Sequence, residues 1–522
     1  MKDNYSKAIK IIIVIGFSLL FVYEAVILVT RGLYYYYGDM VDMSTKFIRD
    51  LSQGINPYGK EWLYDETALP MTYYESGFFH LLPAALIAMI PGVDALAAGI
   101  IVHGIYVVLT VAAMYFFVRN LTKSKAYGMA AAGISFFVIN IGCTVCNRPD
   151  TLCACLIILG MNIMLEESRS HIFGSDNKIR EWQMAVILVM LMYLKIHYAS
   201  IMVAVIFVYL KNIKNKRVWF LGLKTMAVGI IVTAVTQLLF PTFFSTYGIR
   251  VYQMFTANTD HGDIEYMLQK WKDLFMFHIP LAVVTVVISI VFIKSIGRIF
   301  KDDFGLFMSV NIMVNLIALC FMGMHKGSYL SYHNIMLMPV LIAVGVYLVS
   351  LLSRKYRILG SSAALVFFGI YVCMLVNNNE KPEITDYADL RMQRQENYAF
   401  FDEYSNGKML ISSAKCAYAY THDLYQWDYG DQIYMPADIG TSPKWNFLFP
   451  YTNLYRERNR EYGLSVLEQI NNKEYSLIVT DSYNIFGIGI GLWEEIPAAI
   501  EENYEVIKEE GDGFVKYWVP KE

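Results

Sequence analysis

The stretch YYYYGDMVD occupies residues 34–42, directly after the first long apolar segment of the chain, roughly residues 9–30. It places two carboxylates, Asp39 and Asp42, within a few residues of the end of a predicted transmembrane helix. Carboxylates close to hydrocarbon are costly and are often retained for chemistry or for a cation. Two simpler interpretations also fit, because Asp39 can cap the helix that follows and Asp42 can be a solvated surface charge. The rest of the chain favours the catalytic interpretation of Asp39.

The chain as a whole has the composition of a membrane protein. Of its 522 residues, 56% are hydrophobic and only 17% are charged, whereas soluble domains are about half apolar and about a quarter charged. Apolar runs long enough to span a bilayer recur up to residue 376, and none occurs in residues 377–522. We therefore predict a polytopic α-helical membrane domain over residues 1–376 and a small soluble α/β domain over residues 377–522. No basic tract indicates binding of nucleic acid.

The positions of Lys and Arg predict how the chain is threaded. Basic clusters such as Arg354, Lys355 and Arg357 alternate with loops that are poor in Lys and Arg, and cytoplasmic loops carry the excess of basic residues. This places the N-terminus in the cytoplasm, and it places residues 32–93 and the C-terminal domain outside. The short apolar segment 78–90 must then lie in the interface or re-enter. About eleven spans are predicted, near residues 9–30, 94–118, 126–146, 150–166, 182–194, 198–210, 218–240, 275–297, 304–323, 334–352 and 359–376.

The C-terminal domain has the pattern of an α/β fold. Residues 408–413 and 475–481 have the pattern of buried strands, and residues 504–507 and 514–519 that of a hairpin. No nucleotide-binding or hydrolase motif occurs in it. The four cysteines between residues 143 and 155 match the spacing of zinc ligands poorly, and small residues in apolar segments commonly pack helices. No metal site is therefore predicted.

The polar residues of the outward loops share one side of the membrane. By the threading above, carboxylates of the first loop face the same side as several cationic residues, namely Arg148, Lys195, His325, Lys326 and His333. A carboxylate can act as a base or hold a cation, and Arg and Lys bind phosphate oxygens. Simpler interpretations remain open: Arg148 can cap or snorkel at a helix end, and Lys195 can balance a buried acid.

In order and spacing, these motifs resemble the GT-C superfamily of integral-membrane glycosyltransferases. The resemblance is strongest to the bacterial branch that contains aminoarabinose transferases and protein O-mannosyltransferases, and it covers most of residues 1–350. Its pieces are Gly38-Asp39, the stretch GINPY at 54–58, the Pro- and Tyr-rich segment 70–82, Arg148-Pro149-Asp150, Lys195 and Tyr332-His333-Asn334.

The resemblance implies an inverting transferase with its catalytic base in the first outer loop. Asp39 matches the base, and Asp42 is the second candidate. The implied residues at the donor phosphate are Arg148, Lys195, Lys326, His325 and Tyr329. The implied residues that contact substrate are Tyr58, Tyr74, Glu75, His197 and His333. No cofactor is implied; a divalent cation fits the chemistry, but no ligand set compels it.

Three functions fit this pattern. The first moves a sugar from a polyprenyl phosphate to a cell-envelope glycan, lipid or protein on the outer face of the membrane. The second is an oligosaccharide ligase or polymerase that uses a polyprenyl-diphosphate donor. The third is a flippase or transporter of lipid-linked sugars, but transporters usually carry internal repeats, and the two halves of this sequence show none. The sequence favours the first, and it names neither the sugar nor the acceptor.

Overall fold

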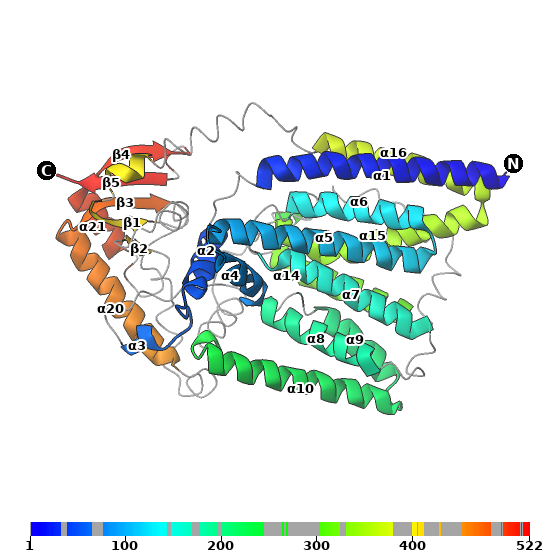
Figure 1. The fold of residues 1–522 in the computed structure, drawn as a ribbon, viewed down its shortest axis with the longest axis horizontal. Helices are drawn as coiled ribbons and strands as arrows, with labels where there is room; N and C mark the ends of the chain where they lie inside the picture. The colour runs from blue at the N-terminus through cyan, green and yellow to red at the C-terminus, as the bar shows by residue number, and fades with distance from the viewer. Residues whose placement is uncertain are drawn as a thin grey trace.

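In the computed structural model, long helices run side by side in one bundle, and a small sheet lies beyond one end of it (Figure 1). The structure describes residues 2–32, 39–64, 77–142, 148–169, 178–195, 198, 200–244, 264–265, 268–269, 303–323, 330–378, 399–404, 406–411, 427–429, 451–481, 492, 494–511, 513 and 515–522. The bundle helices are α1 (Lys2–Gly32), α5 (Ala95–Thr122), α6 (Lys125–Gly142), α7 (Asp150–Arg169), α8 (Lys178–Leu194), α9 (Ser200–Lys211), α10 (Lys216–Leu239), α14 (Asp303–Gly323), α15 (Leu330–Lys355) and α16 (Arg357–Asn378).

Five helices of the described part, α1, α5, α7, α10 and α15, contain spans long and apolar enough to cross a membrane. The chain is therefore a polytopic membrane protein, as its composition predicts. Local signals mark the helix ends: the Asp94 side chain accepts a hydrogen bond from the Ala97 N–H at 2.7 Å and caps α5, and Lys123 ends it with a φ of 57°. The predicted total of about eleven spans stays a prediction, because the span expected at residues 275–297 lies outside the described residues.

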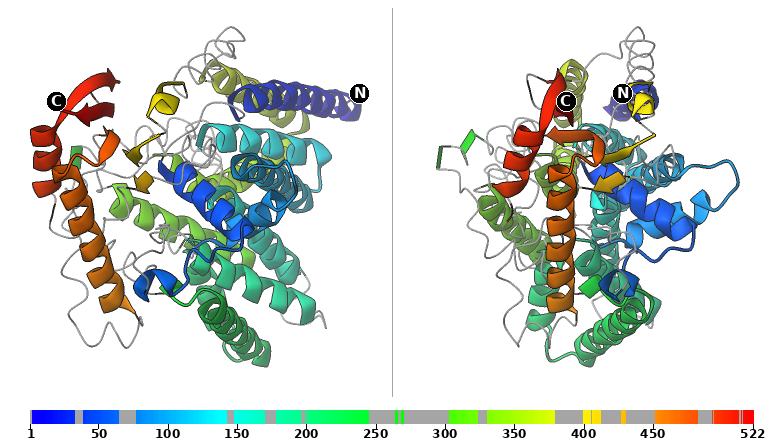
Figure 2. Two further views of the ribbon diagram at one scale, coloured as in Figure 1. Left: turned by 60° about the vertical axis from the view of Figure 1, so that its left-hand side comes forward. Right: turned by 90° about the vertical axis from the view of Figure 1, so that its left-hand side faces the viewer.

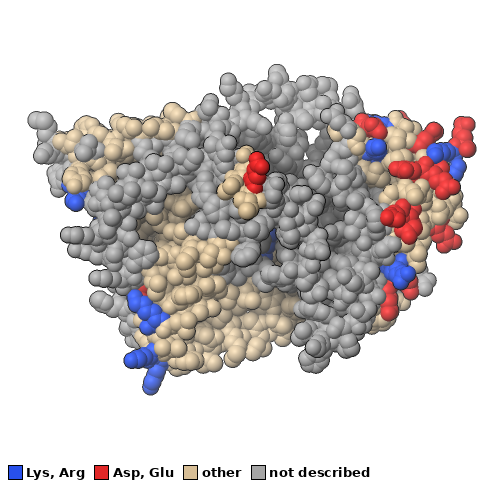
Figure 3. Space-filling model, turned by 180° about the vertical axis from the view of Figure 1, so that it is seen from behind, with Lys and Arg blue, Asp and Glu red and all other residues tan. Residues whose placement is uncertain are grey.

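Successive helices alternate in direction, so the basic clusters gather at one end of the bundle. The turns between α5 and α6, α9 and α10, and α15 and α16 carry them. The start of α16 also meets the start of α1, where the hydroxyls of Ser362 and Tyr5 lie 2.9 Å apart. Figure 3 shows Lys and Arg at this end, remote from the C-terminal domain.

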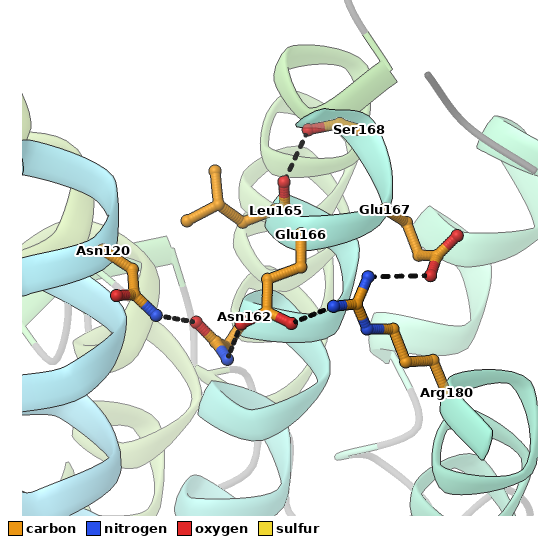
Figure 4. Close-up of polar contacts among 7 residues, drawn as sticks. All are labelled: Asn120, Asn162, Leu165, Glu166, Glu167, Ser168 and Arg180. Atoms are coloured by element: carbon orange, nitrogen blue, oxygen red, sulfur yellow. Dashed lines mark hydrogen bonds and ion pairs between the residues drawn. The ribbon is translucent and has the colours of Figure 1, made fainter. Parts of the chain in front are cut away.

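A polar network ties three helices together at this basic end (Figure 4). Arg180 of α8 lies 3.0 Å from the carboxylate of Glu166 and 3.4 Å from that of Glu167, both on α7. The Asn162 amide donates to Glu166 at 3.3 Å and accepts from Asn120 of α5 at 3.2 Å. These bonds hold α7 and α8 together as antiparallel neighbours. The start of α7 therefore lies next to the end of α8 at the other end of the bundle.

Short helices lie between the bundle and the sheet (Figures 1 and 2). They are α2 (Asp39–Ser52), α3 (Glu61–Tyr64), η1 (Phe79–Leu81) and α4 (Leu82–Ala88). With seven residues, α4 is only about 10 Å long, so it does not cross a bilayer. Leu86 on α4 is 68% exposed and Met89 just after it 61%, which suits a helix lying in the interface. The prediction that this segment does not span is consistent with this geometry.

An aromatic core joins these short helices to the end of α10. Phe78 packs against Phe47, Tyr58, Phe240 and Phe243, with ring centroids 4.4 to 5.5 Å apart. Polar contacts secure the same junction: Asn56 donates to the Leu239 carbonyl at 2.7 Å, and the Thr242 hydroxyl donates to the Tyr58 carbonyl at 2.9 Å. The GINPY stretch thus anchors the first loop to α10.

The C-terminal domain is built on a five-stranded sheet with the order β2-β1-β3-β5-β4. Its strands are β1 (Lys408–Ile411), β2 (Trp427–Tyr429), β3 (Tyr475–Asp481), β4 (Tyr504–Glu510) and β5 (Val515–Pro520). β1 runs parallel to β2 and β3, while β3, β5 and β4 are antiparallel neighbours. The two predicted buried strands and the predicted hairpin are confirmed.

Alternate residues of this sheet face two different cores, as the two-residue period of a strand requires. Leu410 and Ile478 pack with α20 (Thr452–Asn471) and α21 (Glu495–Asn503) on one face. Met409 and Leu477 belong to the core that also contains the aromatic residues of the first loop. At this junction the Lys60 ammonium lies 4.9 Å from the centre of the Tyr451 ring. The sheet domain is therefore docked on the end of the bundle that carries α2 and α4.

Candidate functional site

A buried ion pair lies where α7 begins and α8 ends, at the sheet end of the bundle. Because the two helices are antiparallel neighbours, Asp150 and Lys195 meet although 45 residues separate them. The Lys195 Nζ lies 3.0 Å from Asp150 Oδ1, and the Tyr198 hydroxyl donates to the same oxygen at 2.5 Å. Asp150 is 1% exposed, and Tyr198 is fully buried. The three side chains form one charged cluster at membrane depth.

The two helices favour this arrangement electrostatically. Asp150 opens α7, where the partial positive charge of a helix N-terminus stabilises an anion, and Lys195 follows the last residue of α8, where a cation is stabilised. Arg148 precedes Asp150 by two residues, and its charge acts on the Asp150 carboxylate. One buried carboxylate is thus flanked by two cations, which makes a site able to bind an anion.

The sequence missed Asp150 as a site residue. The sequence analysis names Asp150 only within the Arg148-Pro149-Asp150 motif. It also allows that Lys195 balances a buried acid. The structure confirms that balance and identifies the acid. The signal was the pairing of a buried-looking cation with an acid at the start of a neighbouring span. The phosphate-binding role predicted for Arg148 and Lys195 remains a prediction.

The chain before η1 is pressed against the end of α8 next to this cluster. The Gly77 N–H donates to the Leu194 carbonyl at 3.0 Å, and the His80 Nδ1 lies 3.0 Å from the Gly77 carbonyl. A Cβ atom at position 77 would lie 1.5 Å from the Tyr193 carbonyl oxygen. Only glycine permits this approach of two backbones, and the contact holds the residue that precedes Lys195.

We expect Gly77→Ala to push the chain at residue 77 away from the end of α8, because the added Cβ would overlap the Tyr193 carbonyl oxygen. The expected loss of folding free energy is about 2–3 kcal/mol, and any activity that depends on Lys195 should fall with it, because small misplacements of a binding group are costly. Gly104→Ala on α5 is the matched control, since no atom lies within 4 Å of its added Cβ. Denaturation of both variants in the same detergent compares them; equal stability of Gly77→Ala and Gly104→Ala would refute this role of the contact.

The other predicted site residues are placed to different degrees. Asp39 and Asp42 lie on α2, and His333 lies in the first turn of α15, so their backbones are at the sheet end of the bundle; the description does not extend to their side chains. α2 begins at Asp39, so the helix-start interpretation of this residue also stays open. The following predicted residues lie outside the described part of the chain: Tyr74, Glu75, His197, His325, Lys326 and Tyr329.

Tyr58, which is predicted to contact substrate, lies in the aromatic core of the first loop, and its predicted role stays a prediction. Its side chain is 0% exposed and is enclosed by the aromatic core of the first loop. Its ring therefore serves packing. An aromatic residue next to Pro57 in an outer loop gives the same sequence pattern whether it faces a ligand or a core.

Metal ligands are not assembled in the described residues. There, no group of three or more His, Cys, Asp or Glu side chains is placed to hold an ion. Cys153 and Cys155 are buried in α7 and form no disulfide, while Cys143 and Cys146 both lie outside the described part. The structure therefore adds no argument for a divalent cation.

An apolar groove of about 900 Å³ runs between α8, α9 and α10. Residues at its ends and middle include Trp219 near the basic end, Gly229 in the middle, and Tyr193 and Phe244 near the sheet end. α10 packs against α8, but only 6% of its span is buried, so most of its surface is exposed, and it forms one wall of the groove. Tyr193 and Lys195 both lie at the sheet end of α8, so the groove and the charged cluster reach the same end of the bundle.

Comparison with known proteins was made through both sequence and structure. No protein-family model and no curated protein sequence matches the chain. Among solved structures, ArnT from Cupriavidus metallidurans bound to undecaprenyl phosphate is similar with a TM-score of 0.57 and 10% identity, over 96% of this chain and 97% of that one. The oligosaccharyltransferase of Archaeoglobus fulgidus in the apo form is similar with a TM-score of 0.52 and 12% identity, over 98% of this chain and 74% of that one.

At identities this low the similarity concerns the fold, and it extends over nearly the whole chain. It includes the membrane bundle, the short helices of the first loop and the region of the sheet domain. The resemblance inferred from the order of short motifs is therefore confirmed in three dimensions. The chain has the fold seen in ArnT and in the oligosaccharyltransferase, which are members of the GT-C superfamily.

Proposed function

We propose that this protein is an inverting glycosyltransferase that moves one sugar from a polyprenyl-phosphate donor to a cell-envelope acceptor. Two observations carry the proposal: the cations Arg148 and Lys195 at the sheet end of the bundle, and an apolar groove along α8, α9 and α10 that extends to the same end of α8. A lipid phosphate needs both features: cations for its head and an apolar wall for its tail. The shared fold with ArnT, whose structure holds undecaprenyl phosphate, supports the same donor class.

In this proposal the donor tail lies in the groove and its phosphate is bound by Arg148 and Lys195. The groove lies in the part of the bundle that faces lipid, so a polyprenyl chain enters it without leaving an apolar medium. Charge-assisted hydrogen bonds from Arg and Lys are the strong contacts that proteins use for phosphate oxygens. The predicted Lys326, His325 and Tyr329 remain candidates for further contacts.

The reaction is a displacement at the anomeric carbon. The acceptor hydroxyl attacks from the face opposite the phosphate, and Asp39 takes its proton as general base. A bond forms between the acceptor oxygen and the anomeric carbon, while the bond from that carbon to the phosphate oxygen breaks. The electron pair leaves with polyprenyl phosphate, whose new charge is stabilised by the two cations. The configuration at the anomeric carbon is inverted.

The distribution of charge supports an orientation with the basic end of the bundle in the cytoplasm. The charged cluster, α2 and the sheet domain then face the outside, where cell-envelope acceptors are found. The docked sheet domain covers this end of the bundle (Figure 2), so we assign it a role in shaping access of the acceptor.

The test of this proposal uses purified protein in lipid with a panel of short polyprenyl-phosphate sugars and crude envelope extract as acceptor. The measurement is release of polyprenyl phosphate. Release from one sugar donor supports the proposal and identifies the sugar. Release from no monophosphate donor overturns it, and release only from diphosphate donors assigns the protein to the ligases or polymerases. Movement of intact donor across the bilayer without release would favour a flippase.

Filling the groove should weaken binding of long donors more than that of short ones. Gly229→Leu places a branched side chain against Val189, which lies 4.0 Å from the position of an added Cβ. We expect KM for a donor of full chain length to rise about tenfold, equivalent to losing the burial of about two methylene groups, with little change for a donor of two isoprene units. Gly369→Leu on α16, where no atom lies within 4 Å, is the control. An equal rise for both chain lengths would contradict the placement of the tail.

A further inference from the structure

Among the described residues, only one of the two carboxylate oxygens of Asp150 accepts hydrogen bonds. Its Oδ1 accepts from both Lys195 and Tyr198, whereas its Oδ2, which is buried, has no hydrogen-bond partner among the described residues. A carboxylate that served only to hold the fold would be expected to satisfy both oxygens, because a buried acceptor without a partner is costly. The geometry therefore calls for a role beyond packing.

That role follows from the formal charges of the cluster. Arg148 and Lys195 each contribute one positive charge and Asp150 contributes one negative charge, so the three residues together carry one net positive charge. The proposed donor is a phosphodiester and carries one negative charge. The product, polyprenyl phosphate, is a monoester and carries about 1.5 to 2 negative charges at neutral pH. A cluster of net charge +1 matches the donor, whereas one of net charge +2 would match the product.

We propose that Asp150 is a positioning residue that sets the charge of the phosphate site, so that the site favours the donor relative to its more highly charged product. This inference rests on the function proposed above. Asp150 acts through the cations it neutralises, without contact to the reacting atoms. It holds Lys195 in place, and its negative charge cancels one positive charge that would otherwise attract the product phosphate more strongly.

The expected effect follows from Coulomb's law. One added charge about 6–8 Å from the phosphate, at an effective dielectric constant of about 20, favours a dianion over a monoanion by about 30- to 100-fold. Asp150→Asn should shift relative affinity toward the product by that factor. Lys195→Gln removes a positive charge and should shift it toward the donor. The double variant D150N/K195Q restores the wild-type net charge and should restore the wild-type ratio.

Tyr198→Phe is the matched control for loss of structure. It removes one hydrogen bond to the same carboxylate oxygen and leaves every charge in place. We expect it to weaken both ligands together, with the ratio of their affinities unchanged. Disruption of the fold would not shift the ratio of the two affinities in opposite directions in Asp150→Asn and Lys195→Gln.

The experiment measures binding of two probes to the full chain in nanodiscs by calorimetry: a short polyprenyl phosphate and its methyl ester, which is a phosphodiester. At pH 7.5 the ratio of the two dissociation constants should follow the net charge of the cluster across the four variants. At pH 5 the monoester is largely monoanionic, because its second pKa is about 6, and the shift should shrink toward the wild-type ratio.

The outcomes separate the two proposals. Wild-type protein that binds both probes, with the same ratio in the charge variants, overturns the role of Asp150 and leaves the proposed function standing. Wild-type protein that binds neither probe overturns both. If one single variant does not fold, the other one and the double variant still test the direction of the shift.

Discussion

Asp39→Asn is expected to lower the rate of sugar transfer about 1,000-fold, the usual contribution of a general base. The substitution is chosen because it separates the two interpretations of this residue. Asparagine caps a helix about as well as aspartate, so α2, which begins here, should keep its start. An amide does not accept a proton at neutral pH, so catalysis should be lost. Release of polyprenyl phosphate and binding of the donor are measured on the same preparation.

Asp42→Asn is the control on the same helix, three residues further on. We expect it to keep most of the activity. If Asp42→Asn abolishes release while Asp39→Asn retains it, the base is Asp42 and the displacement mechanism stands with a different proton acceptor. Full activity in both variants would remove the first loop from the chemistry.

The second large effect is expected on stability. Lys195→Met leaves the Asp150 carboxylate buried, at 1% exposure, without its partner at 3.0 Å. Removing one member of a buried ion pair typically costs about 3–5 kcal/mol, and because Arg148 still acts on the carboxylate we expect a cost near the lower end, about 3 kcal/mol. We expect this variant to unfold at lower denaturant in mixed micelles by a corresponding amount.

The rescue variant makes this expectation specific. Adding Asp150→Asn to Lys195→Met removes the uncompensated charge, so the double variant should recover most of the lost stability. Lys516, paired with Glu509 at 3.7 Å with side chains 41% and 51% exposed, provides the comparison: Lys516→Met should cost less than about 1 kcal/mol, as exposed pairs do. A similar loss at both lysines, or no recovery in the double variant, would contradict the account of a buried pair.

The sequence predicted the fold well where local pattern decides it. Apolar runs and basic turns predicted the helices and the alternation of their ends, and hydrophobic segments with a glycine turn predicted β3 and the hairpin of β4 and β5. The packing of Tyr58 could not be predicted from the sequence, because it depends on Phe240 and Phe243, which follow α10 and lie far away in the chain.

The candidate site was predicted in part for a similar reason. The predicted topology puts Arg148 and Lys195 on the same side of the membrane, because the distribution of Lys and Arg among the loops is enough to predict which loops share a side. It did not show that Asp150 contacts Lys195, since that depends on α7 and α8 being neighbours with their ends level. The glycine at position 77 was likewise invisible, because its importance lies in the distance between two backbones.

The exposure of α10 has a consequence for the proposed function. Only 6% of its span is buried, so in that proposal the groove is open to membrane lipid, and a polyprenyl chain would arrive sideways from the bilayer while the aqueous phase supplies the acceptor. Two substrates then approach from two different solvents without competing for one entrance. The concentration that governs saturation is accordingly the mole fraction of donor in the membrane, and diluting the donor with inert lipid should slow the enzyme at constant bulk concentration.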